Sequence, residues 1–467
     1  MDLVQDVFHS LKERGDDPVC IEPHEDGGRT TWSANELLAR IYELSALFSR
    51  HGIGAKSRVA LLLDNSADFI ATFMALAAVG AVAAPVKVDS GSSELEKIIS
   101  NLQPHALVAE DRALARIEQF RDGRLLFHRK DRAIHVSGTL SQSDETAGEI
   151  PDDVVSINYT YRGYGYPLGA MIPGGQYVLG ADVFQQGMAG TQCRRMLVFL
   201  PMTHIFTLIG CVFVPLLYGM TTVLSPSVHP RRVFQLVEEY KIDFITSVPE
   251  VLSLLARFKP AHVDTSTLDI VATGGSTLTA EAYTEIRNAL RVELLHGYGL
   301  TEFTPVSRNI RHSARPGTVG VVGRELSVKL EAADSSQEGE ILIQSPTMFR
   351  GYYRNPLETR EAWTDGWFRT GDIGRFDDDH LVFVREKKRT CKVNGIMVDL
   401  AEVERAIEAH PGVHHAVTAL VDGSLQADIA LHAGFEPAQT TSEIRNALKD
   451  SISSHKIPKS INQTFRQ

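Results

Sequence analysis

The sequence predicts an α/β protein with two parts: a large N-terminal layered α/β domain that contains a β-rich module, and a small, hinged α+β C-terminal domain. Apolar runs of strand length alternate with helical periodicity as far as residue 295, which is typical of a layered α/β core. From Thr318 onward, short strands separated by turn residues indicate the β-rich module. A basic, polar link, EKKRT, follows Arg385 and precedes a compact α+β segment.

The first elements follow from periodicity and from the residues that end each run. Ser33 or Asn35 is available as the N-cap of the first long helix, and Asp64-Asn65 ends an apolar run typical of a buried strand. We expect helices at residues 31–51, 67–79, 233–240 and 279–290. We expect strands at residues 58–63, 82–86, 244–248, 268–272 and 292–295. Helices and strands that alternate in this way predict mostly parallel sheets.

The later elements are shorter and lie closer together. We expect strands of the β-rich module at residues 328–331, 340–344 and 381–384. In the C-terminal part we expect strands at residues 391–398, 414–421 and 427–433, with helices at residues 400–410 and 442–453. We therefore place an N-terminal domain at residues 1–385, with its β-rich module at about residues 318–385, and a C-terminal lid domain at residues 386–467.

Composition narrows the classes of function and of partner. The 467 residues are 43% apolar and 22% charged, as in an ordinary soluble globular protein, and the net charge is −11. This charge disfavours a nucleic-acid or anionic-membrane partner. The four cysteines, which are Cys20, Cys193, Cys211 and Cys391, are far apart and form no CxxC pair. They predict free thiols in a reducing, cytoplasmic setting and no zinc site.

One segment has enough apolar length to span a bilayer. Residues 196–224 contain no Asp, Glu, Lys or Arg. However, Pro201, His204 and Pro215 interrupt the segment, and no basic loop sets an orientation. We therefore expect a buried strand, a turn and a core helix here, and no membrane span.

The segment HGYGLTE, residues 296–302, holds the strongest candidate site. Two glycines let the backbone approach a ligand closely, and Tyr298 offers a flat face for an adenine ring. Thr301 offers a hydroxyl to a phosphate, and Glu302 offers a carboxylate to Mg²⁺. Taken alone, the segment also fits a loop with an acidic end.

Other motifs accompany this segment in a fixed order. They are LPMTHIF at residues 200–206, GEILIQ at residues 339–344, RGYYRNP at residues 350–356 and WFRTGD at residues 367–372. In this order and at these intervals, the pieces resemble the AMP-forming acyl-CoA synthetase superfamily, which includes fatty-acid and aryl-CoA ligases, peptide-synthetase adenylation domains and luciferases. The resemblance covers residues 31–459, and the conjunction is specific although each motif alone is weak.

The resemblance implies a ligase that works in two steps. A fatty or aryl carboxylate attacks the α-phosphate of ATP, with Mg²⁺ as cofactor, and gives an acyl-AMP and pyrophosphate. A thiol, from CoA or from the pantetheine arm of an acyl carrier protein, then displaces AMP. The protein's part is positioning and charge stabilisation. The negative net charge disfavours a carrier protein, which is usually acidic, unless a local basic patch is present.

The resemblance also implies roles for single residues. Tyr298 should stack on adenine, Thr301 should contact the α-phosphate and Glu302 should hold Mg²⁺, while Asp372 should accept hydrogen bonds from the ribose hydroxyls. The other nucleotide-binding positions are Thr160, Arg162, Gly165, Gly275, Ser276, His296, Gly297, Gly299 and Arg385. The positions on the acyl side are His204, Phe206, Thr273 and Gly274. For His204, a core histidine in an apolar segment is an equal alternative.

The hinge and its lysines follow from the same resemblance. Lys388 falls on the hinge near residues 386–389, and Lys392 falls on the family's second lysine; both are candidate catalytic residues. The arginine that usually precedes the hinge is Glu386 here, with Arg385 one place early, so either position is a candidate for the ribose contact. A solvated basic linker is the alternative for the lysines of this segment other than Lys388.

The phosphate loop departs from the family's pattern, which reads approximately YTSGTTGKPKG. Here residues 159–169 read YTYRGYGYPLG, with both lysines replaced, by Tyr166 and Leu168. Such a loop presents backbone N–H groups and small hydroxyls to a polyanion. Arg162 is a candidate replacement for the lost charge, because a guanidinium binds phosphate in a bidentate manner. The alternatives are a loop that no longer grips pyrophosphate and a turn without a ligand.

A second departure lies near residues 455–459, HKIPK. In relatives a Gly-Lys dipeptide follows this stretch, and its lysine drives adenylation; no such dipeptide follows here. Either the chain is truncated or the lysine has been dispensed with. Loss of that ammonium group should slow acyl-AMP formation severely and affect thiol transfer less. Two other hypotheses therefore stay open: a catalytically impaired member that binds an acyl group, an adenylate or a partner protein, and a transferase that uses a preformed acyl-adenylate.

Overall fold

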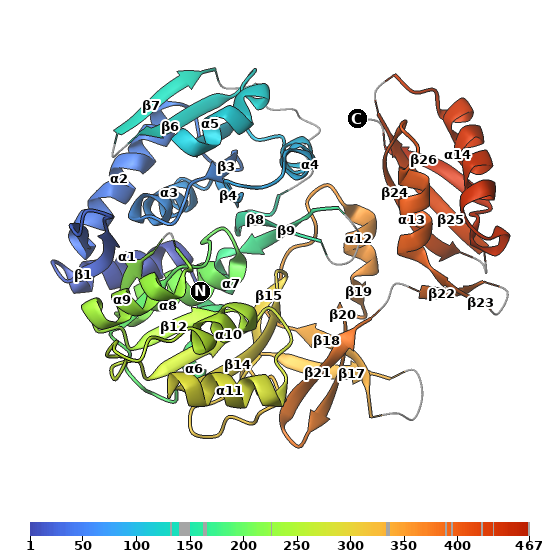
Figure 1. Ribbon diagram of the computed structural model, residues 1–467. Helices are drawn as coiled ribbons and strands as arrows, with labels where there is room; N and C mark the ends of the chain where they lie inside the picture. Colours follow the sequence, from blue (N-terminus) through green and yellow to red (C-terminus); the bar gives the residue numbers. More distant parts are fainter. Residues whose placement is uncertain are drawn as a thin grey trace. The chain divides into compact units, whose positions relative to one another are not determined.

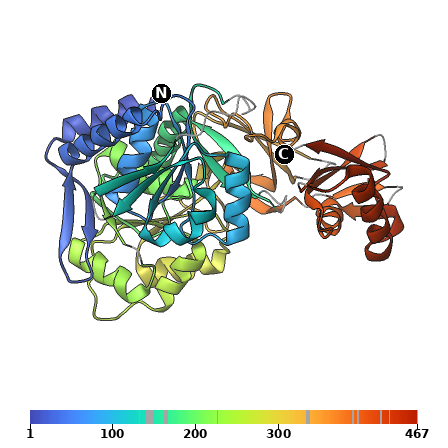
Figure 2. The ribbon, with the colours of Figure 1, turned by 90° about the horizontal axis from the view of Figure 1, so that it is seen from above.

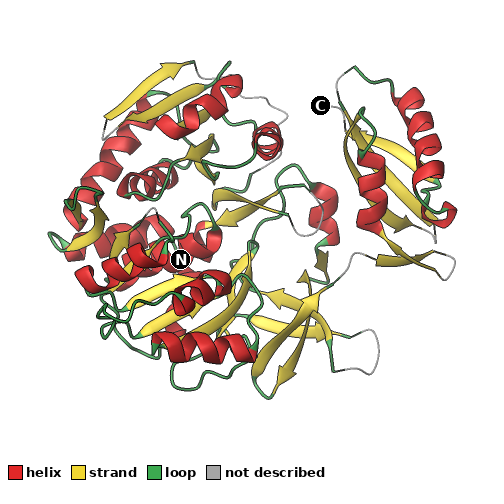
Figure 3. Cartoon of the chain, in the orientation of Figure 1, coloured by secondary structure: helices red, strands yellow, loops and turns green. Residues whose placement is uncertain are grey.

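The computed structural model describes residues 1–130, 133–139, 150–161, 166–225, 227–332, 337–387, 390–393, 396–421, 424–432 and 434–465. The chain divides into two compact units. The large unit consists of residues 1–160 and 167–385, and the small unit consists of residues 161–166 and 386–467. Both units mix helices and strands (Figure 3), so the predicted α/β class is confirmed.

The first sheet of the large unit is mostly parallel. Its strands are β3 (Arg58–Leu62), β4 (Val82–Pro85), β5 (Ala106–Glu110), β6 (Leu125–Lys130), β7 (Ala133–Gly138), β8 (Val154–Thr160) and β9 (Leu168–Pro173). They lie in the order β7-β6-β5-β3-β4-β8-β9. The inner pairs are parallel, and only β7 and β9 run antiparallel to their neighbours. This sheet agrees with the parallel core expected from alternating helices and strands.

The second sheet joins parallel strands to an antiparallel extension. The strands of its parallel part and edge are β1 (Pro18–Pro23), β2 (Arg29–Ser33), β10 (Arg195–Val198), β11 (Thr221–Leu224), β12 (Phe244–Ser247), β13 (Ile270–Thr273) and β14 (Glu293–Leu300). The extension contains β15 (Phe303–Arg308), β16 (Val321–Val322), β17 (Ser327–Glu331), β18 (Gly339–Gln344), β19 (Trp363–Thr364), β20 (Trp367–Asp377) and β21 (His380–Glu386). Strands β10 to β14 pair in parallel, whereas β14 and β15 pair antiparallel. The β-rich module is therefore continuous with the parallel strands (Figure 1).

Helices lie on both sides of the strands of the large unit, as the view from above shows (Figure 2). They are α1 (Leu3–Arg14), α2 (Ala34–Arg50), α3 (Ala67–Ala78), α4 (Ser92–Leu102), α5 (Asp111–Ile117), α6 (Gly174–Gly187), α7 (Ile205–Thr207), α8 (Val214–Tyr218), α9 (Pro230–Tyr240), α10 (Pro249–Arg257), α11 (Ala280–Leu290) and α12 (Pro356–Glu361), with a short 3₁₀ turn at Glu118–Phe120. Of the two predicted caps of α2, Ser33 is the one used. Its hydroxyl accepts from the Glu36 N–H, and the Glu36 carboxylate accepts from the Ser33 N–H.

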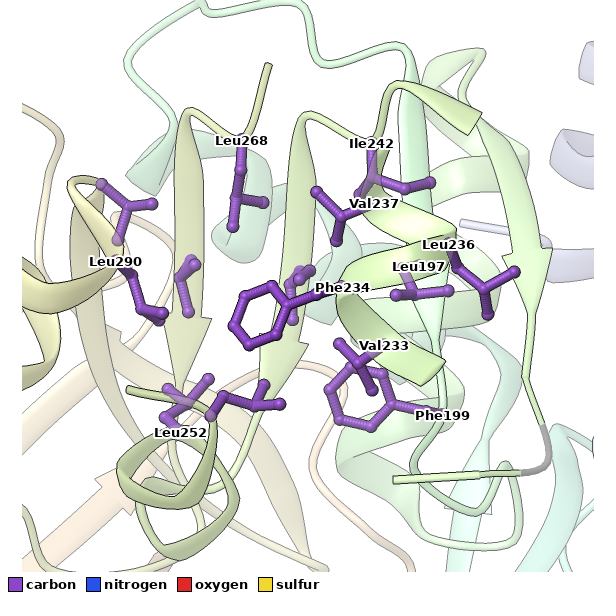
Figure 4. Packing of buried hydrophobic residues seen from close by; sticks show 14 of the residues in the cluster. Leu197, Phe199, Val233, Phe234, Leu236, Val237, Ile242, Leu252, Leu268 and Leu290 are labelled. Carbon is purple, nitrogen blue, oxygen red and sulfur yellow. The ribbon is translucent and has the colours of Figure 1, made fainter. Parts of the chain in front are cut away.

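The core beside β12 to β14 is a layer of apolar side chains from three helices and the sheet (Figure 4). Phe234 of α9 lies at its centre and is 1% exposed. Leu252 of α10 and Leu290 of α11 lie in the same layer. Burial of one such side chain contributes about 1.5–3 kcal/mol to the stability of the folded chain. This layer holds the strands whose carboxyl ends build the candidate site.

The uncharged segment at residues 196–224 folds into buried elements of the large unit, as expected. It forms β10, α7, a π-helical stretch (Leu208–Phe213), α8 and β11, and most of its side chains are buried. Pro215 lies just after the π-helical stretch, inside the continuous helical run formed by α7, this stretch and α8. Among the helices that the structure describes, none is long and apolar enough to cross a membrane.

The described part of the small unit contains the hairpin β22-β23, the sheet β24-β25-β26 and the helices α13 and α14. Its elements are β22 (Thr390–Val393), β23 (Ile396–Asp399), α13 (Leu400–Glu408), β24 (Val413–Val421), β25 (Ser424–Leu431), α14 (Pro437–Ser451), a 3₁₀ turn (Ser454–Lys456) and β26 (Ser460–Phe465). The single strand predicted at residues 391–398 is wrong, because β22 and β23 pair antiparallel as two strands. The Asn394-Gly395 dipeptide between them is a hairpin signal that outweighs the apolar run.

A buried carboxyl group in the first sheet predicts a pH-dependent stability. Glu110, at the end of β5, is 9% exposed, and burial together with the neighbouring Asp64 carboxyl raises its pKa from 4.5 to about 7. The folded chain therefore holds a proton that the unfolded chain has already lost between these pH values. Stability should fall as the pH rises through this window, because the folded state must then bury the charged carboxylate.

We therefore expect Glu110→Gln, which mimics the protonated acid, to remove this loss. The melting temperature of the variant should exceed that of the unmodified protein by a margin that grows from pH 5 to pH 8. Glu118→Gln is the matched control, since Glu118 is exposed and pairs with Arg121 on the surface. Thermal unfolding followed across this pH range measures the effect. If the melting temperatures of Glu110→Gln and of the unmodified protein change with pH in parallel, Glu110 is not responsible for the loss of stability.

Candidate functional site

Several predicted site residues meet at the carboxyl edge of the parallel strands β13 and β14. Thr273 and His296 are partners in the register of the two strands. Gly274 follows Thr273, and a Cβ atom on it would lie 3.1 Å from the Gly297 carbonyl oxygen and 3.4 Å from the Phe206 ring. This edge of an open α/β sheet is where ligands bind. The structure therefore brings residues predicted for the acyl side next to residues predicted for the nucleotide.

His296 is a neutral group in this arrangement. The side chain is buried, and burial lowers its pKa. Its Nδ1 atom lies 3.2 Å from the Thr318 carbonyl oxygen, which can only accept a hydrogen bond. The proton therefore sits on Nδ1, and His296 contributes no positive charge to the site at neutral pH. Beside it, Gly275 is left-handed with φ of 79°, and the exposed Ser276 donates to the Glu250 carboxylate.

Residues 296–300 of the segment HGYGLTE form a strand, and Thr301 and Glu302 lie in a turn, so the alternative of a loop is wrong for all but the acidic end. Strand β14 continues to Leu300 and pairs with β15 through Tyr298 and Ser307. We expected the glycines to let the backbone approach a ligand closely, but at Gly299 the close neighbour is another strand. A Cβ atom there would lie 2.3 Å from the Thr304 Oγ1 atom and 2.8 Å from its Cβ, so the close approach is to β15.

Tyr298 and Asp372 form the central polar contact of the site. The Tyr298 hydroxyl donates to Asp372 Oδ2 at 2.6 Å, although 74 residues separate them in the chain. Burial, together with the Asp372 carboxylate, raises the pKa of Tyr298, so this hydroxyl keeps its proton. The ring of Tyr298 lies near that of Phe383, with centroids 6.1 Å apart. The residue expected at adenine and the residue expected at ribose are thus direct neighbours.

A bulge in β20 turns Asp372 toward this contact. The pairing of β18 with β20 shifts register between Glu340 and Leu342, opposite Thr370–Gly371–Asp372. Glu340, which is 4% exposed, accepts from the Gly371 N–H at 3.2 Å. The Thr370 hydroxyl accepts from the Asp372 N–H at 3.0 Å. Bulges of this kind re-aim side chains beside functional sites.

Glu302 lies in the turn between β14 and β15 and is fully buried. The Tyr352 hydroxyl donates to its Oε1 atom. A carboxylate beside the Thr301 hydroxyl suits Mg²⁺, which prefers oxygen ligands and is commonly held by one or two carboxylates plus phosphate oxygens. A single buried carboxylate next to a hydroxyl is a donor set that fits Mg²⁺ when phosphate oxygens of a nucleotide supply the other ligands.

The loop that carries His204 is held from the other sheet. Asn65, which follows β3, donates from Nδ2 to the Leu200 carbonyl and accepts on Oδ1 from the Met202 N–H, both at 2.8 Å. His204 is exposed at the start of α7, so the alternative of a buried core histidine is wrong. Phe206 is half-buried against the core cluster. Asn65 thereby fixes the loop that carries His204, one of the residues expected on the acyl side.

The remaining predicted residues are not part of this group of contacts. Thr160 ends β8 and pairs with Leu168 of β9. Arg385 is exposed near the end of β21. Arg162, Gly165 and Lys388 lie outside the described residues, and Lys392 lies on β22 with no description of its side chain.

Sequence reasoning missed three residues that organise the site, namely Asn65, Glu340 and Tyr352. Asn65 served only as the end of an apolar run, although its amide can donate and accept at once. Glu340 and Tyr352 lie inside motifs that were noted as accompaniments. For Glu340 and Tyr352 the available signal was a polar group within a largely apolar or aromatic segment, because a buried polar side chain needs a partner.

Comparison with known proteins gives a consistent picture. The family model described as "AMP-binding enzyme" matches residues 7–353. A feruloyl-CoA synthase of Amycolatopsis is 26% identical over 461 residues, covering 94% of this chain and 91% of that protein. A long-chain-fatty-acid–CoA ligase of Mycobacterium tuberculosis is 28% identical over 419 residues, covering 86% of this chain and 82% of that protein.

Solved structures share the fold over the whole chain. An anthranilate CoA ligase in complex with anthranoyl-AMP matches with a TM-score of 0.73 and 21% identity, covering 100% of this chain and 94% of that chain. A fatty acyl CoA synthetase of Mycobacterium tuberculosis matches with a TM-score of 0.73 and 23% identity, covering 99% of this chain and 94% of that chain. At these identities, the likeness establishes the fold.

Proposed function

For a chain that belongs to the family of AMP-binding enzymes, we propose an acid–thiol ligase, which activates a fatty or aryl carboxylic acid with ATP and passes the acyl group to a thiol through an acyl-AMP. The observation that carries the proposal is the hydrogen bond between Tyr298 and Asp372. The curated relatives, which are named as CoA ligases or synthases for ferulate and long-chain fatty acids, support the same reaction class.

The nucleotide lies, in this proposal, across the carboxyl edge of β13 and β14. The ring of Tyr298 supplies the flat face for adenine. The Asp372 carboxylate accepts from the two adjacent ribose hydroxyls, since an ionised carboxylate can accept several hydrogen bonds at once. Glu340 and Thr370 hold the bulge that presents Asp372, so the ribose acceptor is fixed before the nucleotide arrives.

The acid lies on the other side of the same edge, beside Phe206 and Gly274. The Phe206 ring lies against Gly274 and would form an apolar wall for the acyl group, and we assign Thr273 and His204 as polar groups on this side. The carboxylate attacks the α-phosphate, and pyrophosphate leaves. The thiol then attacks the acyl carbon, and AMP leaves with the bonding electrons of the anhydride.

Charge on the transferring phosphate must be balanced during the first step. Mg²⁺, held by Glu302 and the phosphates, would supply positive charge there. Thr301 donates its hydroxyl to the α-phosphate, and neutral His296 adds no charge. Arg162, Lys388 and Lys392 are the chain's own cations that we assign to the phosphates and to the acyl-adenylate.

Acid-dependent exchange of labelled pyrophosphate into ATP tests this proposal. The panel should contain hydroxycinnamic acids, benzoic and anthranilic acids, and fatty acids of 8 to 16 carbons, each with Mg²⁺. We expect exchange with at least one acid, and AMP release on addition of a thiol. If AMP or an acyl-AMP analogue binds but no acid supports exchange, the ligase is excluded, and the protein is an impaired member that binds an adenylate or uses a preformed one.

CoA is our proposed acceptor, and an acyl carrier protein is the alternative. The net charge of −11 opposes an acidic carrier protein. Thioester formation with CoA and with a phosphopantetheinylated carrier protein, measured side by side, separates the two. We place the reaction in the cytoplasm, a setting supported by four free cysteines, three of which are buried.

A further inference from the structure

Tyr352 belongs to a short segment that is attached to strand β9. The Tyr353 N–H donates to the Gly169 carbonyl, and the Met171 N–H donates to the Gly351 carbonyl. Tyr352 and Ala170 form an isolated antiparallel β-bridge. Figure 1 shows the chain before α12 passing beside β9. Strand β9 begins at Leu168, within the sequence segment that resembles a phosphate loop. The backbone of Tyr352 is therefore tied to the strand that leaves this loop.

The side chain of Tyr352 reaches the other half of the site. It is 2% exposed, and its hydroxyl donates to Oε1 of the fully buried Glu302. The ring packs against Phe349, with centroids 4.9 Å apart. The Tyr352 N–H donates to the Thr359 hydroxyl at 2.8 Å, which fixes the residue from a third side. One residue thus joins β9 to the carboxylate that we assign to Mg²⁺.

We propose that Tyr352 is a positioning residue that holds the Glu302 carboxylate in one orientation relative to β9 and the phosphates. This inference rests on the proposed function, in which Glu302 holds the metal. A carboxylate with one oxygen fixed by a hydroxyl presents its other oxygen in a defined direction. Hydrogen bonds of this kind to a ligating carboxylate typically change metal affinity by about 10- to 100-fold.

The chain supplies a matched control next to Tyr352. Tyr353 is 1% exposed and lies on the same segment, so the same hydroxyl deletion can be made in the same setting. Its hydroxyl has no hydrogen-bond partner among the residues that the structure describes. Tyr352→Phe and Tyr353→Phe therefore remove the same atom from neighbouring buried rings, and only the first removal deletes the hydrogen bond to Glu302.

The test uses the full chain with Mn²⁺ as the metal probe and α,β-methylene-ATP as the nucleotide. Isothermal titration gives the Mn²⁺ affinity without turnover. Exchange assays with an active acid give the Mg²⁺ concentration for half-maximal rate and the KM for that acid. For Tyr352→Phe we expect Mn²⁺ affinity to fall by about 10-fold and the Mg²⁺ requirement to rise equally, with the acid KM unchanged. Tyr353→Phe should match the unmodified protein in all three.

The outcomes separate this inference from the function on which it rests. If the unmodified protein binds the nucleotide with Mn²⁺ and catalyses exchange, but Tyr352→Phe keeps the same Mn²⁺ affinity, the positioning role is overturned and the ligase stands. A Tyr352→Phe variant that loses acid and metal affinity together would also overturn it, because that pattern reports a general structural change. If the unmodified protein binds no metal with the nucleotide, both the inference and the metal role of Glu302 fail.

Discussion

Glu302→Gln is expected to reduce acid-dependent exchange by about 100-fold or more. The change keeps the shape of the side chain but removes the negative charge that we assign to holding Mg²⁺, and the positive charge of Mg²⁺ would stabilise the charge that develops on the phosphate. Glutamine still offers an oxygen to the Tyr352 hydroxyl, so the buried contact survives. Glu302→Ala is the harsher change. It leaves that buried hydroxyl without its acceptor, which costs about 1–3 kcal/mol of stability in addition to activity.

The comparison of these two variants separates chemistry from folding. Exchange rates give the loss of activity, and thermal unfolding gives the loss of stability. Glu285→Gln is the matched surface control, since Glu285 is exposed on α11, which covers the same strands. An exchange rate close to that of the unmodified protein in Glu302→Gln would remove Glu302 from the metal site, whatever the behaviour of the alanine variant.

The fold could be predicted largely because its signals are local. The ends of α3 and β4, for example, follow from the glycine break after Val79 and from apolar runs of fixed length, and the structure places them within one or two residues. Where two local signals compete, periodicity alone fails. Residues 391–398 contain the sequence Asn394-Gly395, which is typical of a hairpin turn, and the structure has two antiparallel strands here, β22 and β23.

The candidate site could be predicted only in part, because sequence motifs do not specify which residues contact one another. Tyr298 and Asp372 were assigned to one nucleotide, yet their direct hydrogen bond spans 74 residues and depends on a register shift in β20. Asn65 and Tyr352 act through contacts with Leu200 and Glu302, which are also far from them in the chain. Such pairs are set by tertiary packing, which periodicity does not encode.

Asp372→Asn should lower kcat/KM for ATP by about 100-fold, mainly through KM. The Tyr298 hydroxyl can still donate to an amide oxygen, so the local fold should persist. The ribose hydroxyls, however, lose an ionised acceptor, and hydrogen bonds to a charged group are worth about 1.5–3 kcal/mol each.

Asp377→Asn is the control, because Asp377 lies exposed on the same strand. Titration with AMP and the acid KM complete the measurement: AMP affinity should fall in parallel while the acid KM stays constant. An Asp372→Asn variant with unchanged AMP affinity would place the ribose elsewhere and leave the Tyr298 contact with a purely structural role.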